Sequence, residues 1–260
     1  MTSRRRRTRT SLTSVIVLLA LAVGGYALHS TGVLLPGPDA DAAPAATATA
    51  SAEPTISTGP TTGVGDGTDA GGASSPDAVA EAKRLLDTLP VKGKAPATGY
   101  DRVEQFGSAW LDVDHNGCDT RNDILARDLS DVVRKGPCTV TRGTLVSPYT
   151  GATVDFVRGQ DTSTLVQIDH VVALENAWRT GAQQLTQAQR VALANDPDNL
   201  FAVDGRSNSQ KRSGDAATWL PANRAFRCTY VEHQVSVKAE YGLWVVPAER
   251  EAVLRVLASC

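Results

Sequence analysis

The feature that most limits what this chain can fold into is a long stretch of small and polar residues at positions 37–76. The stretch is rich in Ala, Thr, Pro, Gly and Ser and holds almost no large apolar side chains. Such a segment cannot bury enough apolar surface to offset the entropy that ordering would cost. We therefore expect a flexible linker at 37–76 and a folded domain at 77–260.

Residues 1–36 have the order of a secretory signal peptide. A basic run, Arg4–Arg9, precedes an uncharged apolar stretch from Val15 to Leu28. This stretch is shorter than the roughly 20 helical residues that cross the hydrocarbon core of a bilayer, and its flanks are typical of an export signal. We therefore expect a secreted protein. An uncleaved segment would instead anchor the domain to the outer face of the cell membrane, and we expect a membrane contact only in that case.

The charge balance limits the range of partners. The formal net charge of the 260-residue chain is −2, and the part after the linker is also close to neutral. A protein that coats nucleic acid without specificity carries a broad basic field that releases counterions from the phosphates. The balance argues against that class and leaves room for an enzyme with a local basic site. We infer no stable protein partner from the sequence.

All four cysteines lie in the expected domain, at Cys118, Cys138, Cys228 and Cys260. An even number in an exported chain favours two disulfides, for which three pairings exist. We expect Cys118–Cys138 and Cys228–Cys260, because each bridge then closes a local loop and the second holds the C-terminus. A zinc site is the competing use of four cysteines, but the chain has no Cys-x-x-Cys pair.

Periodicity predicts an α+β domain. Spacing typical of helices occurs near 78–88, 101–111, 122–134, 174–180, 186–194, 207–217 and 248–258. Asp77 is the expected cap of the first helix. Short runs typical of strands occur at 138–141, 153–157, 165–168 and 200–203. Few strands and no regular alternation of strand and helix argue against a doubly wound sheet.

The residues best suited to chemistry lie between positions 167 and 215. This segment contains, in order, Asp169-His170 at the end of an expected strand, Asn199-Leu200 at the start of another, Asn208 near the start of a helix, and Lys211-Arg212 just after it. A strand end can twist, so neighbouring side chains there can reach one cavity. The order therefore predicts a single polar site built from two strands and a helix.

This arrangement resembles the HNH nuclease motif. It is most similar to the exported HNH-like family related to the C-terminal nuclease domain of GmrSD-type restriction enzymes. The resemblance covers about residues 98–260 and includes Trp178–Ala182 and Asn195–Pro197. It implies a ββα-metal core with additional helices, stabilised by disulfides, that cuts nucleic acid, with DNA as the expected substrate. Asn208 stands where many relatives have His, which leaves the identity of the metal open.

The chemistry of phosphodiester hydrolysis gives these residues roles. The reaction needs a group that deprotonates water and an electrophile that binds phosphate oxygens. A neutral imidazole suits the first task near neutral pH, so His170 is the expected general base. Asp169 and Asn208 are the expected ligands of one divalent ion, and their oxygen donors favour Mg²⁺ or Mn²⁺.

The resemblance implies that Asn199 orients the base histidine through the backbone. Lys211 and Arg212 are expected to contact phosphate. Each residue alone has an ordinary structural explanation, such as a buried histidine, a helix cap or a solvated helix face. The whole pattern at this spacing favours a nuclease site.

A second motif runs from Asp112 to Asp123. It matches the D-x-D-x-N-G template of a calcium-binding loop, with Asp123 at the twelfth position, where Glu is usual. The expected ligands of Ca²⁺ are Asp112, Asp114, Asn116 and Asp123. Two alternatives stay open: an Asx-rich turn that caps the next helix, and a border of the nuclease cleft around Arg121.

Two other functions remain as alternatives to the endonuclease. One is a non-catalytic, calcium-stabilised extracellular binding module, which would show a calcium-dependent melting temperature without hydrolysis. The other is a phosphatase or phosphodiesterase for small substrates, which would turn over a small phosphodiester without cutting nucleic acid.

Overall fold

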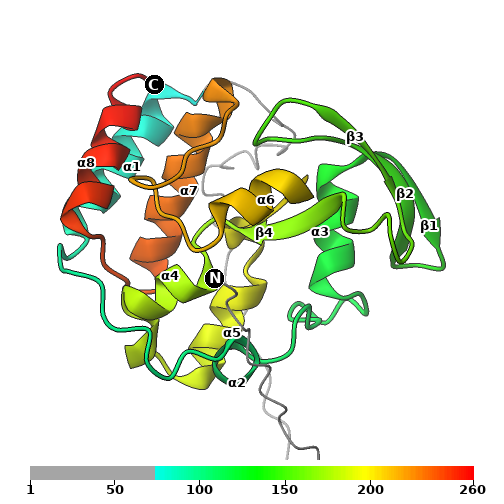
Figure 1. Cartoon of the computed structure of the whole chain (residues 1–260), viewed down its shortest axis with the longest axis horizontal. Helices are drawn as coiled ribbons and strands as arrows, with labels where there is room; N and C mark the ends of the chain where they lie inside the picture. Colours follow the sequence, from blue (N-terminus) through cyan, green and yellow to red (C-terminus); the bar gives the residue numbers. More distant parts are fainter. Residues whose placement is uncertain (1–73) are drawn as a thin grey trace, which may run out of the picture. The chain divides into compact units, whose positions relative to one another are not determined.

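The computed structural model describes residues 74–260 (Figure 1). The expected signal peptide and nearly all of the expected linker lie outside the described residues. Within residues 74–260, no helix is long and apolar enough to cross a membrane. The helices are α1 (Pro76–Thr88), α2 (Arg102–Phe106), α3 (Thr120–Asp128), α4 (Leu174–Arg179), α5 (Gln187–Asn195), α6 (Gly205–Lys211), α7 (Arg227–Glu240) and α8 (Pro247–Leu257).

The strands form two separate antiparallel sheets. A three-stranded sheet has the order β1 (Ser130–Lys135), β2 (Thr139–Val146), β3 (Thr153–Val157). A two-stranded sheet pairs β4 (Val166–His170) with β5 (Leu200–Asp204), in a register that places His170 opposite Leu200. In Figure 1 the three-stranded sheet lies at one end of the domain, α1, α7 and α8 lie at the other, and the β4–β5 pair with α6 lies between them. The fold is therefore α+β, as the sequence predicts.

The β4–β5 pair is held between two apolar clusters. Leu200 and Ala202 of β5 belong to the cluster beneath α3 and the three-stranded sheet. Val203, one position further, belongs to the cluster formed by α1, α7 and α8, and Phe201 packs against that cluster. Because successive strand residues point to opposite faces, β5 contributes to both clusters at once. This strand pair is consequently buried on both sides, which fixes the position of the side chains at its ends.

Two disulfides join the expected cysteines. Cys118 pairs with Cys138, and Cys228 pairs with Cys260, with Cα–Cα distances of 5.2 and 5.9 Å. The bridges close loops with sequence separations of 20 and 32 residues. Loops of that length correspond to about 3–4 kcal/mol of stabilisation each in the chain-entropy account. The second bridge fastens the end of α8 to the start of α7.

Three features of the fold differ from the sequence expectations. The cap of α1 is Ser75, whose side chain accepts the amide N–H of Ala78, and not Asp77. The helix expected at 122–134 ends at Asp128, because the Asp128 carboxylate accepts the N–H of Ala202 and residues from 130 onward pair as β1. Helix α7 was not expected, because two polar residues, Gln234 and Lys238, occupy buried positions and interrupt its apolar pattern.

Candidate active site

The site is formed at the end of β4 and along α6, the helix that follows β5 directly and reaches back to His170 through Lys211. Asp204 caps this helix by accepting the N–H of Ser207 at 2.9 Å. Gly205 allows the helix to start against the loop before β4, since a Cβ atom there would lie only 2.1 Å from the Thr164 carbonyl oxygen. The Asp-Gly pair therefore places α6 beside β4 (Figure 1), and its Asn208 and Lys211 side chains contact Gln167 and Asp169 of that strand.

His170 is the last residue of β4 and is 5 % exposed. Its Nε2 lies 2.8 Å from the Ala194 carbonyl oxygen. A carbonyl can only accept, so Nε2 carries the hydrogen and Nδ1 keeps a lone pair. The ring is stacked with Trp110, with centroids 6.0 Å apart. Burial lowers the pKa of His170 to about 3, and the charges of Arg102 and Lys211 act in the same direction. The imidazole is thus neutral near neutral pH, and Nδ1 carries the free lone pair.

Asn199 fixes the backbone that follows this histidine. Its Oδ1 accepts the N–H of Val172 at 2.8 Å, and its Nδ2 donates to the Leu193 carbonyl at 3.2 Å. Its own carbonyl accepts the N–H of Val171 at 2.8 Å. Asn199 therefore ties the residues after His170 to the segment that ends in Ala194, the acceptor of the histidine. This geometry suits the orienting role that the resemblance implies.

Asp169 precedes His170 in β4, and Lys211 and Tyr149 hold its carboxylate in place. Lys211 Nζ lies 2.9 Å from Asp169 Oδ2 and donates to the His170 carbonyl oxygen at 2.7 Å. The Tyr149 hydroxyl donates to Asp169 Oδ2, and burial together with the Asp169 charge raises the pKa of Tyr149 well above its usual value, so it stays protonated. The Lys211 side chain is 0 % exposed. Lys211 was expected to contact phosphate, but in the structure its ammonium group is buried and pairs with Asp169.

Asn208 reaches the same site from α6. Its Nδ2 donates to Gln167 Oε1 at 2.9 Å, and this bond sets the orientation of the amide. The side-chain oxygen Oδ1 of Asn208 is then left to coordinate a cation. Together with the Asp169 carboxylate, the site offers oxygen ligands of the kind that Mg²⁺ and Mn²⁺ prefer. Both oxygens of the Asp169 carboxylate also contact Lys211, and Oδ2 accepts the Tyr149 hydroxyl. Binding of a divalent ion at Asp169 and Asn208 stays a prediction.

A cleft of about 280 Å³ brings these residues together. Of the residues expected to carry chemistry, Asp169, His170, Asn208 and Arg212 line it. Residues that the sequence reasoning did not identify also line it: Tyr100, Arg102, Glu175 and Ser213. Arg102 gave no sequence signal, because it lies far from the motif in the chain and belongs to a short helix whose residues show no catalytic pattern.

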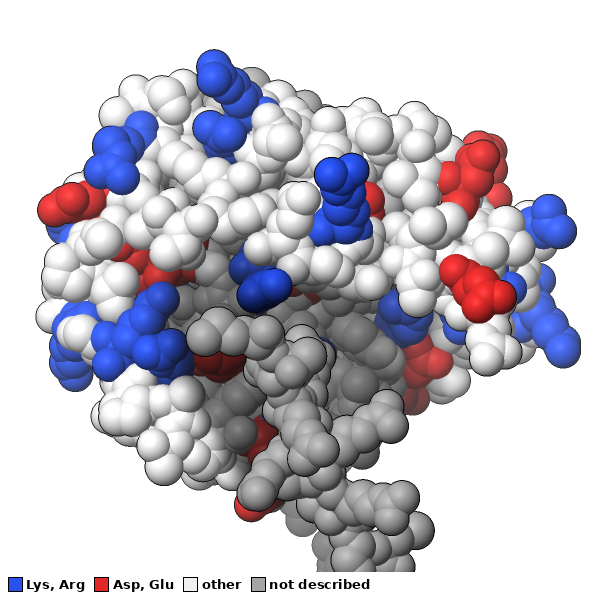
Figure 2. Space-filling view, in the orientation of Figure 1, with Lys and Arg blue, Asp and Glu red and all other residues white. Residues whose placement is uncertain are grey.

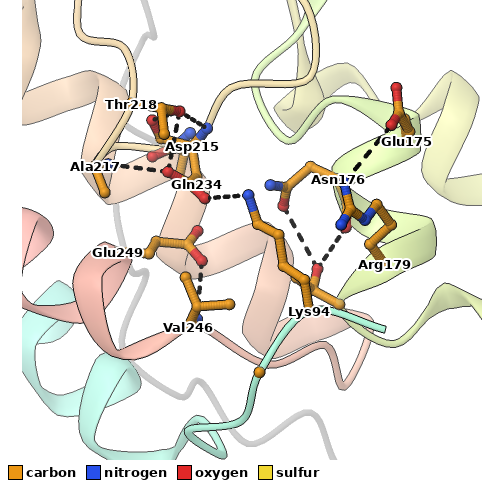
Figure 3. A network of polar contacts seen from close by, with 12 residues as sticks. Lys94, Glu175, Asn176, Arg179, Asp215, Ala217, Thr218, Gln234, Val246 and Glu249 are labelled. Carbon is orange, nitrogen blue, oxygen red and sulfur yellow. Dashed lines mark hydrogen bonds and ion pairs between the residues drawn. The ribbon is translucent and has the colours of Figure 1, made fainter. Parts of the chain in front are cut away.

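A buried polar network supports the site from the side of α7 (Figure 3). Gln234 Nε2 donates to the carbonyl of Val171, the residue after His170, at 3.2 Å. Asp215, just beyond α6, pairs with Lys94 at 2.7 Å. Glu249 pairs with the buried Lys238 at 2.6 Å. Gln234 thus ties the residue after His170 to α7, Lys94 ties the chain after α6 to the segment between α1 and α2, and the Lys238–Glu249 pair joins α7 to α8.

The Asp112–Asp123 loop folds around its own amide groups. Asp112 accepts the N–H groups of Asn116 and Gly117 at 3.1 and 3.0 Å, and Asn116 Oδ1 accepts that of Cys118 at 2.7 Å. Asp119, not one of the expected ligands, caps α3. In residues 74–260, no three His, Cys, Asp or Glu side chains are grouped closely enough to hold a metal ion. Calcium binding at Asp112, Asp114, Asn116 and Asp123 stays a prediction.

Arg121 does not border the cleft. Its guanidinium is partly buried and donates to the Val166 carbonyl at 3.2 Å, and burial lowers its pKa. Arg121 therefore stabilises the start of β4 through this hydrogen bond to Val166.

Comparison with known proteins shows the family of this chain. The chain belongs to the family described as GmrSD restriction endonucleases, C-terminal domain, whose sequence model matches residues 119–256. A relative from Arthroderma benhamiae, called an uncharacterized secreted protein, is 38 % identical over 181 residues, which cover 69 % of this chain and 84 % of the relative. No solved structure matches the chain.

Proposed function

We propose that this protein is an exported HNH-type endonuclease that hydrolyses nucleic-acid phosphodiester bonds, with DNA as the expected substrate. The observation that carries the proposal is the meeting of Asp169, His170, Asn208 and Arg212 in one cleft. These residues come from β4, from α6 and from the residue that follows α6. Membership of a restriction-endonuclease domain family supports the reaction class.

His170 is suited to take a proton from water. Its Nε2–H is engaged by Ala194, so the lone pair on Nδ1 is the basic position. Its lowered pKa keeps that position free of a proton at neutral pH. Stacking on Trp110 and the backbone ties from Asn199 keep the ring from rotating away. The chain thus presents a neutral, oriented base at the cleft.

Asp169 and Asn208 would hold one divalent ion. Such an ion would polarise the phosphate and stabilise the charge on the leaving oxygen. Lys211 and Tyr149 keep the Asp169 carboxylate in place from behind, while Gln167 keeps the Asn208 amide oriented. Arg212 would bind a phosphate oxygen at the rim of the cleft.

Export is part of the proposal. The basic and apolar segments before residue 37 support it, and so does the description of the Arthroderma relative as secreted. The two disulfides fit an oxidising environment.

Plasmid cleavage by the purified chain with Mg²⁺, Mn²⁺ or EDTA tests the proposal. We expect nicking that requires metal and that His170→Ala abolishes while the melting transition remains cooperative. Asp169→Asn and Asn208→Ala should both raise the metal concentration needed. Full activity in His170→Ala would eliminate this mechanism. A folded protein that cuts nothing under any metal, and melts higher with Ca²⁺, would favour the calcium-stabilised binding module.

A further inference from the structure

The cleft carries positive charge that no acidic group of the described chain neutralises. On the face shown in Figure 2, basic and acidic side chains are interspersed, so the protein has no broad basic field there. In residues 74–260, the arginines with ion-pair partners are Arg84, Arg127, Arg179, Arg250 and Arg255. Arg102 and Arg212 are not among them, and both line the cleft with His170. The cleft therefore contains two guanidinium groups, those of Arg102 and Arg212, that have no ion-pair partner among residues 74–260 and lie in the same cleft as the candidate base.

Arg102 is placed at the His170 end of the cleft by α2. Phe106 at the end of this five-residue helix is buried against the cluster that contains Leu174 and Trp178. Arg102 itself is exposed to solvent. It lines both the cleft and a small recess beside it that Trp110 and His170 also line. The Arg102 charge lowers the pKa of His170, which agrees with a guanidinium close to that ring.

Arg212 lines the same cleft, together with Asn208 and Ser213. Its backbone has φ +50° and ψ −124°, a conformation that side chains other than glycine rarely adopt. The chain leaves α6 at this residue, and the Lys211 carbonyl accepts the N–H of Gly214 at 2.8 Å. The turn therefore directs Lys211 inward and leaves Arg212 exposed at the rim.

Glu175 is the acidic side chain at this cleft other than Asp169. Its carboxylate lies 4.0 Å from Arg179, one helical turn away. Its negative charge is thus partly balanced within α4 and does not pair with Arg102 or Arg212.

We propose that Arg102 binds a phosphate next to the one that is cut, so that the preferred substrate is a polynucleotide strand and not a small phosphodiester. The inference rests on the proposed function, because it takes the cut to occur at His170 and Asp169.

Binding measured without hydrolysis tests the phosphate contact directly. A fluorescein-labelled single-stranded oligonucleotide is titrated with the full chain in EDTA at several salt concentrations. A phosphate contact on single-stranded nucleic acid contributes about 0.7 to the slope of log K against log salt. We expect Arg102→Gln to reduce the slope by about that amount. The matched control, Arg255→Gln, removes the same charge from an exposed position on α8 and should leave the slope unchanged. Equal slopes for the wild type and Arg102→Gln, or no binding at all, would overturn the inference.

Cleavage kinetics separate this inference from the proposed function. With Mg²⁺, Arg102→Gln should lower kcat/KM on the oligonucleotide by at least about tenfold, mainly through KM. Its activity on bis(p-nitrophenyl) phosphate, which has one phosphate, should stay close to that of the wild type. An equal loss on both substrates would mean that Arg102 acts on the cut phosphate or on His170, and would refute a flanking-phosphate site. If the wild type cuts neither substrate but the slope still falls in Arg102→Gln, the endonuclease proposal fails and the phosphate site stands.

Discussion

Burial of His170 makes the stability of this protein depend on pH in a way that one substitution should remove. The pKa of His170 is lowered to about 3 in the folded protein, first by burial and then by the charge of Arg102. In the unfolded chain the pKa returns to about 6.5. The unfolded state therefore binds a proton more readily, and the stability that a neutral His170 allows is present above about pH 6.5 and is lost as the pH falls toward 3.

The size of the effect follows from the two pKa values. Between those values, stability falls by about 1.36 kcal/mol per pH unit. Going from about pH 7.5 to about pH 5 should therefore cost about 2 kcal/mol through this residue alone. His170→Gln removes the titrating group and keeps an amide that can donate to Ala194. Its free energy of unfolding should lack this 2 kcal/mol, although other groups will still contribute a pH dependence to both proteins.

Urea unfolding followed by tryptophan fluorescence measures the difference. Both proteins are unfolded at several pH values between about 7.5 and 5 with the disulfides intact. The curves of unfolding free energy against pH should diverge below about pH 6.5, with the wild type falling faster. Parallel curves, within about 0.5 kcal/mol, would show that His170 is hydrated or charged in the folded protein and would refute the reasoning about its burial.

Two further substitutions address the elements around the base. Lys211→Met leaves the buried Asp169 carboxylate without its cation. Thermal unfolding should show that the free energy of unfolding falls by about 3–5 kcal/mol. Adding Asp169→Asn to the same chain should restore part of this loss. No recovery in the double variant would mean that Lys211 acts through packing alone. Gly205→Ala introduces a Cβ atom 2.1 Å from the Thr164 carbonyl; chemical denaturation should show a loss of about 1–3 kcal/mol, and a neutral effect would show that the start of α6 can move.

The sequence was informative about which residues meet and less so about how they are used. Asp169, His170, Asn208 and Arg212 were expected in one site, and the structure places all four in one cleft. Lys211 was expected to contact phosphate but faces inward, where its ammonium group pairs with Asp169 and donates to the His170 carbonyl oxygen. Both partners come from the end of β4, a long-range contact that the spacing within the motif does not predict.

Long-range contacts explain the remaining differences. Arg102 reaches the cleft only because α2 packs by Phe106 against the segment that follows β4. No local pattern predicts that contact. Helix α7 carries Gln234 and Lys238 on its buried side, and both find partners from distant segments, Val171 and Glu249. A periodicity argument reads such residues as surface positions. The fold class and the disulfide pairing, by contrast, depend on local strands and on short closed loops, and both were predicted.

The connection between β4 and β5 has a further consequence for the base. A hairpin needs only a few residues, yet this one contains α4 and α5. The connection supplies the Ala194 carbonyl to His170 and the Leu193 carbonyl to Asn199. The tautomer of the histidine is thus selected by the backbone of the inserted segment. If α5 shifted so that the Ala194 carbonyl withdrew, the proton could occupy either ring nitrogen, and the proposed base would lose its fixed tautomer with every residue of the cleft still in place. The inserted segment therefore sets the tautomer of the proposed base, although it contributes none of the proposed metal or phosphate contacts.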